Sequence, residues 1–222
     1  GVAVVDITYP GGGITGIGRI TGFNSNTDVD LEVLSRFSDT GSSDNWQQGY
    51  WSEARGFPTA VSLHGGRLAH ANGGTLFLSV SDDYENFADT TVGDAGPIIK
   101  TLGSGPVDAI KFLSGLTRLV IGTAGAELAA RASDLNEALT PDNTNASIPF
   151  STRGAASLRA LKLDTSGLYV SRSGQRVMLA GPEVQQATLG EKRPFDLTLL
   201  VPDLLAAGAV SVAIQRAPDT RL

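Results

Sequence analysis

The sequence predicts an all-β protein made of propeller-like blades, in an incomplete set, with a small N-terminal β-module. Three observations lead to this class: frequent glycines, short apolar and β-branched runs separated by turns, and a loose repeat with a period near 50 residues. Glycine occurs 27 times, and it supplies the positive φ angles that tight turns between strands require. Hydrophobic residues make up 41% of the 222, which is enough for a packed core.

Residues 1–50 are predicted to form the small β-module. Residues 2–9 are an apolar, β-branched run that ends at a glycine cluster, and residues 14–23 and 29–37 are predicted as two further strands. Residues 38–50 are polar and rich in Gly and Ser, so we interpret them as a loop or a domain boundary.

Residues 51–222 are predicted to hold three blade-like repeats and the start of a fourth. Each unit reads as a strand, a turn, a strand with an early leucine, a second turn and another strand. The units cover residues 59–81, 107–131 and 158–181, and a strand at 210–215 opens the fourth.

The early leucine of each unit sets the period of the repeat. It is Leu68, Leu119 and Leu168, at steps of 51 and 49 residues, and a further step of 54 reaches Leu222. Units of this length with three or four strands are typical of propeller blades, which bury their faces by stacking on one another. Three and a half units do not close a ring, so either flanking sequence completes it or the blades form an open stack. A β-sandwich with coincidental spacing is the alternative.

Two short segments favour helix. Ser133 is a candidate N-cap for a turn of helix over Ser133–Leu139. Residues 201–208 place Pro202 near a helix start and Gly208 at its stop, which predicts about one and a half turns.

Charge and composition exclude several functional classes. The net charge of −6 disfavours general nucleic-acid binding, because an acidic surface repels phosphate. The absence of cysteine excludes disulfides and thiolate metal sites, and fits assembly in a reducing cytoplasm. No apolar run has the length of a membrane span, and no signal peptide is visible. Because the first residue is glycine, we expect a processed chain or part of a longer product.

We predict no catalytic, cofactor-binding or metal site, and no enzyme activity. His64 and His70 flank a glycine turn, but a metal site needs a third ligand on the same face. Converging carboxylates could hydrolyse glycosides, yet the two acidic clusters lie in turn-like or alternating contexts that favour solvated side chains. The glycine-rich loop at 11–18 matches no phosphate-binding motif. The acidic clusters are Asp82, Asp83 and Glu85, and Asp28, Asp30 and Glu32.

From Trp51 onward the order of several motifs resembles the tail nozzle proteins of phages and prophages, of the T7-like tail tubular B type. The segments that carry the resemblance are Trp51-Ser52, Gly56-Phe57-Pro58, Val61 to His64, Arg67-Leu68, Ser79 with Tyr84 to Phe87, residues 107–128 with Leu119-Val120-Ile121-Gly122-Thr123, the Thr-Pro-x-Asn loop at 138–144, and residues 167–178 and 195–222. The turn at Asn72-Gly73-Gly74 is shorter than the corresponding insertion in that family.

The resemblance implies a structural subunit of the virion, assembled in the bacterial cytoplasm. Proteins of this family form a homo-oligomeric ring, commonly a hexamer, that joins other tail and adaptor proteins and lets DNA pass during ejection. It implies no catalytic residue and no cofactor. The alternatives are a carbohydrate- or partner-binding β-module, such as a receptor-binding tail part, and a glycosidase. A glycan site favours exposed aromatic rings, and the only two tryptophans are Trp46 and Trp51, the latter expected to be a packed anchor.

Overall fold

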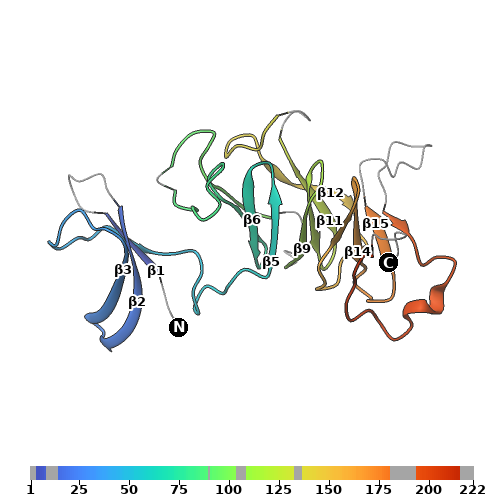
Figure 1. The fold of residues 1–222 in the computed structure, drawn as a ribbon, viewed down its shortest axis with the longest axis horizontal. Helices are drawn as coiled ribbons and strands as arrows, with labels where there is room; N and C mark the ends of the chain where they lie inside the picture. Colours follow the sequence, from blue (N-terminus) through green and yellow to red (C-terminus); the bar gives the residue numbers. More distant parts are fainter. Residues whose placement is uncertain are drawn as a thin grey trace. The chain divides into compact units, whose positions relative to one another are not determined.

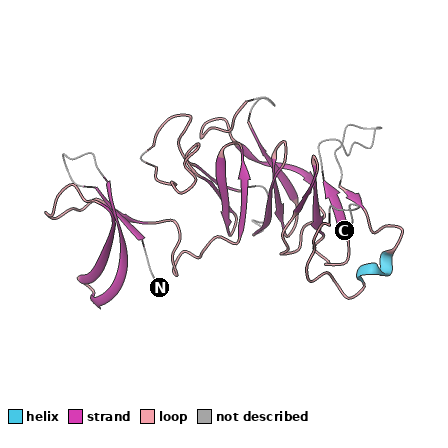
Figure 2. Ribbon diagram, viewed as in Figure 1, coloured by secondary structure: helices cyan, strands magenta, loops and turns pink. Residues whose placement is uncertain are grey.

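The protein is all-β, as the sequence predicts (Figure 2). The computed structural model describes residues 4–8, 15–89, 91–103, 109–132, 137–180 and 194–215. Within them the chain forms four antiparallel sheets of four strands each, and none closes into a barrel. The contacts divide the chain into two compact units, Gly1–Pro58 and Thr59–Leu222.

The N-terminal unit is one sheet with the strand order β3-β2-β1-β4. Its first three strands lie where the apolar runs predict them. The fourth corrects the prediction of a loop over 38–50, because Trp46 pairs with Ile7 and Gln48 with Val5. An edge strand of three residues needs no apolar run of its own, so the polar composition of residues 38–50 did not predict β4. The strands are β1 (Val4–Thr8), β2 (Thr15–Ser25), β3 (Asp28–Ser35) and β4 (Trp46–Gln48).

The second unit contains three sheets, each a meander of four consecutive strands. The first sheet comprises β5 (Ala60–His64), β6 (Arg67–Asn72), β7 (Thr75–Leu78) and β8 (Ile98–Thr101). The second comprises β9 (Ile110–Gly115), β10 (Leu119–Thr123), β11 (Glu127–Arg131) and β12 (Asn145–Ser151). The third comprises β13 (Leu161–Leu163), β14 (Ser166–Val170), β15 (Val177–Ala180) and β16 (Phe195–Asp196).

The leucine markers of the repeat occupy equivalent strands. Leu68, Leu119 and Leu168 lie on β6, β10 and β14, the second strand of each sheet. The turn before Arg67 also has the expected glycine chemistry, because Gly65 and Gly66 both have positive φ, 57° and 72°. Two such residues form the type of turn whose twist matches that of a hairpin. The repeat in the sequence therefore marks repeated hairpins in the fold.

Each sheet has a fourth strand that the three-strand reading of the units did not include. β8 follows a long polar loop, β12 contains Pro149, and β16 has only two residues, so none gave an apolar alternating run. The strand expected at 210–215 is not formed over residues 210–214. There the chain is held to the third sheet instead, since the Ala209 amide donates to the Gly174 carbonyl at 2.8 Å.

The helical expectations have different outcomes. The turn expected over 201–208 is a 3₁₀ helix, η1 (Pro202–Leu205), and Gly208 beyond it has a φ of 85°. The turn expected over Ser133–Leu139 lies partly outside the described residues, and residues 137–139 are not helical. The described part of the chain has no helix with the length and apolar character needed to cross a bilayer.

The three sheets of the second unit stack in chain order (Figure 1). The second sheet is covered on both faces, and every residue of β10 is buried. Both sheets contribute alanines and larger aliphatic residues to the interface of the first pair. The interface of the first and second sheets includes Ala69, Ala71, Leu76, Leu78, Ile98, Leu113, Leu119, Ile121 and Leu128, and that of the second and third includes Phe112, Val120, Tyr169, Met178 and Ala180.

Candidate functional site

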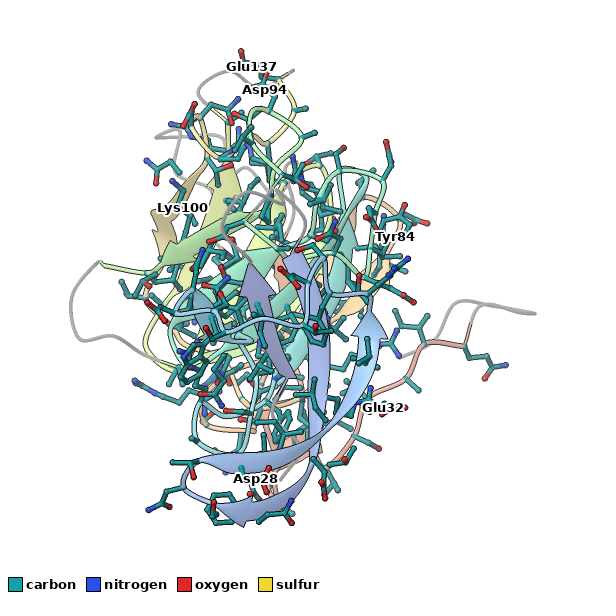
Figure 3. All side chains as sticks on the ribbon, turned by 90° about the vertical axis from the view of Figure 1, so that its left-hand side faces the viewer. Asp28, Glu32, Tyr84, Asp94, Lys100 and Glu137 are labelled. Carbon is teal, nitrogen blue, oxygen red and sulfur yellow. The ribbon has the colours of Figure 1, made fainter. Side chains whose placement is uncertain are left out.

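A cleft of about 580 Å³ lies among loops at one end of the first and second sheets. It brings together parts of the chain that are far apart in sequence. Figure 3 shows Asp94 and Glu137, which contribute carboxylates from two different loops. The lining residues are Gly65, Arg67, Ser81, Asp94, Ala95, Glu137, Ala138, Leu139, Thr140 and Asn143.

Arg67 fixes one wall of the cleft. Its side chain is buried, with the residue 2% exposed, and its guanidinium donates to backbone carbonyls of the loop that joins β7 to β8. The distances are 2.7 Å to Ser79, 2.6 Å to Asp94 and 2.5 Å to Gly96. Burial lowers the pKa of Arg67, and the negative charge of Asp82 opposes that shift. One side chain therefore fastens both ends of an acidic loop to the first sheet.

The Thr-Pro-x-Asn loop forms the other wall. The Thr140 amide donates to the Asn143 side-chain oxygen at 2.8 Å, and the Asn143 amide donates to the Thr140 hydroxyl at 3.2 Å. Asn143 Nδ2 also donates to the Ala138 carbonyl at 3.0 Å. These reciprocal bonds replace the ladder bonds that a loop lacks, so the motif holds the shape of the loop.

Both polar and apolar side chains line the cleft, the apolar ones being Ala95, Ala138 and Leu139. Carboxylates, hydroxyls and an amide line it, and neither an aromatic ring nor a histidine is among the lining residues. The Asn143 side chain contacts the Glu137 carboxylate at 3.5 Å. The polar groups of this surface suit ligands that form hydrogen bonds. Sequence reasoning missed the cleft, because only the fold brings its walls together.

The two histidines lie on opposite faces of the first sheet. His64 is on β5 beside Gly115 of the second sheet, whereas His70 faces away and stacks on Phe87 with ring centroids 5.4 Å apart. Burial lowers the pKa of both imidazoles. In the described residues, no group of three or more His, Asp or Glu side chains is arranged to hold a metal ion.

The two acidic clusters belong to different units of the chain. Asp28, Asp30 and Glu32 lie on β3 and are exposed, and Glu32 pairs with Arg19 at 3.3 Å. Asp82 lies in a turn with a φ of 59°, and its amide donates to the Gly66 carbonyl at 2.8 Å. Asp83 and Glu85 follow in the same exposed turn, outside the cleft lining. The structure thus places neither cluster in the cleft.

Part of the glycine-rich loop at 11–18 lies outside the described residues. Its described part belongs to β2, where a Cβ on Gly16 would lie 2.0 Å from the Phe37 ring and one on Gly18 would lie 2.2 Å from Leu31. These glycines serve side-chain packing. Trp46 on β4 is 62% exposed, and Trp51 is half-buried beside the Tyr50 ring.

A buried polar pair lies between the second and third sheets. Glu127 is 0% exposed and Tyr169 is 2% exposed. Neither the carboxylate oxygens nor the hydroxyl makes a hydrogen bond of good geometry within the described part of the chain. Burial raises the pKa of Tyr169, and the nearby Glu127 carboxylate raises it further, while Arg153 opposes the shift. No pattern in the sequence predicts this pair, since Glu127 is buried only because another sheet packs over it.

Comparison with protein-family models and with curated proteins finds no match for this chain. A function for this chain is therefore proposed from its own residues.

Proposed function

We propose that this chain is a structural component of a phage or prophage tail, part of a nozzle-like wall through which DNA is ejected. The proposal places it in a homo-oligomeric ring, commonly six subunits, in contact with other tail and adaptor proteins of the virion. The observation that carries it is that the described motif residues of the resemblance act as scaffold. Arg67 fastens a loop, Gly122 admits the Phe112 ring, and Asn143 closes the Thr-Pro-x-Asn turn.

The proposal is tested on particles produced from the genome that encodes the chain. An antibody raised against the 222-residue chain, detected with gold in the electron microscope, should label the tail below the neck of intact particles. Labelling of capsid proteins serves as the positive control. Antigen found only in the soluble fraction, with unlabelled particles, would contradict the proposal.

The net charge of −6 suits a conduit for DNA, because a wall that repels phosphate does not retain it. Lysine substitutions at exposed acids, such as Asp28 and Glu32, should slow ejection if these positions face the DNA. Alanine at the same positions separates loss of an acid from gain of a base. An ejection rate unchanged by any added lysine would count against an electrostatic role of the wall.

A carbohydrate- or partner-binding module is the second candidate, and the polar cleft is the observation that favours it. Its hydroxyl, amide and carboxylate groups are those that hydrogen-bond to sugars. Binding of the chain to an array of bacterial surface glycans, compared with a variant carrying Asp94→Ala and Glu137→Ala, tests it. Equal signals from both proteins would reject the cleft as a glycan site.

A further inference from the structure

The ribbon formed by β2 and β3 in the N-terminal unit has one apolar face and one acidic face. Alternate residues of a strand lie on opposite faces of its sheet. Val29, Leu31 and Val33 of β3 share the apolar face, and a Cβ on Gly18 of β2 would meet the Leu31 side chain there. Val29 and Val33 are 40% and 55% exposed, so this face is open along the strand.

The other face of β3 carries three exposed carboxylates, those of Asp28, Asp30 and Glu32. Figure 3 shows Asp28 and Glu32 on this ribbon. Glu32 pairs with Arg19 of β2 at 3.3 Å, and Asn24 Nδ2 donates to the Asp30 carboxylate at 3.1 Å. Arg19 is the one basic residue of β2, so this face is negative.

β3 is also an edge strand of its sheet. β2 lies on one side of it, and no strand of the described part of the chain lies on the other. The edge is eight residues long, from Asp28 to Ser35. The outward amide and carbonyl groups of such an edge are a template on which a further strand can pair.

A second copy of β3 does not suit this edge. A pair in register places carboxylates beside carboxylates, and a shift by one residue places them beside valines. Like charges on directly opposite residues are destabilising. Residues 1–58 contain seven Asp and Glu and three Arg, which gives this unit a formal charge of −4 and repels another copy of it. The sign of the edge therefore favours a basic occupant.

We propose that β3 binds an extended segment of another protein in which basic and apolar side chains alternate. Paired on the open edge, such a strand lays its basic residues beside the three carboxylates of β3 and its apolar residues beside the two valines and the leucine. The backbone hydrogen bonds supply affinity, and the matched alternation supplies specificity. This inference goes beyond the proposed role in a tail and does not depend on it.

Three short peptides, labelled with a fluorophore and measured by anisotropy, test the chemistry of the occupant. The first is Lys-Val-Lys-Val-Lys-Val-Lys, which has the alternation. The second is Glu-Val-Glu-Val-Glu-Val-Glu, and the third is Lys-Lys-Val-Val-Val-Lys-Lys, which has the composition of the first without its alternation. The first should bind at least about tenfold more tightly than the other two, because only it matches both faces of β3.

Hydrogen exchange locates the bound peptide. Amides of residues 28–35 that point away from β2 should exchange more slowly when the first peptide is bound, because they then donate to its carbonyls. Amides of β10, in the other unit, should be unaffected.

A reversal of charge tests the role of the carboxylates. Asp28→Lys with Asp30→Lys should make the chain prefer the acidic peptide to the basic one. Asp39→Lys with Asp44→Lys is the matched control, because both acids are exposed in the loop after β3 and the change in net charge is the same. The control should keep the preference for the basic peptide, and circular dichroism should show the same strand content for both variants.

Several results would overturn the proposal. They are no binding of the alternating basic peptide, equal binding of the block peptide, and an equal loss of preference in the control variant. A dimer in sedimentation velocity whose β3 amides are already protected would also overturn it, since a second copy would then occupy the edge.

Discussion

Replacing Arg67 with Met should release the loop between β7 and β8 while leaving the sheets folded. The change keeps an unbranched apolar stem and removes the guanidinium, whose hydrogen bonds to three loop carbonyls are 2.5, 2.6 and 2.7 Å long. Hydrogen bonds to a charged group contribute about 1.5–3 kcal/mol each. Asp94 is exposed, so part of the loop regains water when it is released. We therefore expect a net loss of about 2–4 kcal/mol for the loop.

Hydrogen exchange followed by mass spectrometry measures this loss where it occurs. The loop has amides protected by hydrogen bonds, among them Ser81 to the Ala95 carbonyl at 2.9 Å and Val80 to the Asn86 carbonyl at 2.8 Å. A loss of about 2–4 kcal/mol corresponds to exchange roughly 30- to 700-fold faster in peptides from this loop. Peptides from β10 and β14 should change little.

Arg159→Met is the matched control for Arg67→Met, because Arg159 is exposed and the two changes are chemically the same. We expect its exchange pattern to equal that of the unmodified chain, since exposed substitutions usually cost less than about 0.5 kcal/mol. If Arg67→Met exchanges like the control, the guanidinium does not fasten the loop. If exchange rises equally in every peptide, Arg67 stabilises the whole unit and the local role is wrong.

Two further predictions concern the interface of the second and third sheets. Gly122→Ala places a Cβ about 2.1 Å from the Phe112 ring, so it should lower the free energy of unfolding, measured in urea, by about 1–3 kcal/mol. Gly103→Ala is the control, because a Cβ at Gly103 meets nothing within 4 Å and should leave the free energy of unfolding unchanged. The raised pKa of Tyr169 means that its stabilising effect is complete below the unfolded value of 10.0 and is lost as the pH rises above it. Between pH 9 and pH 11 the urea midpoint should therefore fall less for Tyr169→Phe than for the unmodified chain. Glu127→Gln should give a fall between those of the other two proteins. Equal falls of the midpoint in all three proteins would contradict this prediction.

The sequence predicted the hairpins well, because each hairpin is encoded locally. The strand 67–71, for example, follows two glycines whose positive φ angles define the turn, and the structure places β6 at Arg67–Asn72. The fourth strands were not predictable in the same way. β16 is two residues long and exists because β15 offers it an edge, through pairs such as Leu179 with Phe195. Its cause lies in the fold rather than in its own composition.

The cleft and the buried pair were beyond local reasoning for the same physical reason. The walls of the cleft come from segments near residues 65, 94 and 140, and no periodicity relates them. Glu127 lies in an Ala-rich run where an acid reads as a surface residue, and it is buried only because the third sheet covers it. Sequence patterns report how a strand meets its own sheet, and they do not report what lies on the other face of that sheet.

The position of a unit in the stack, more than its sequence, decides which of its side chains remain open. β5 and β10 are strands of the same kind of hairpin, yet β10 is buried throughout while alternate residues of β5 are exposed. Buried and exposed residues alternate on β5, as in a sheet with one solvent-exposed face. The exposed residues, however, are Val61 and Leu63, whose apolar side chains are unfavourable in water. A strand that faced water permanently would carry polar residues at these positions. The burial of a strand in this unit therefore depends on whether a second layer packs on its other face, and a sequence pattern examined one strand at a time does not report that.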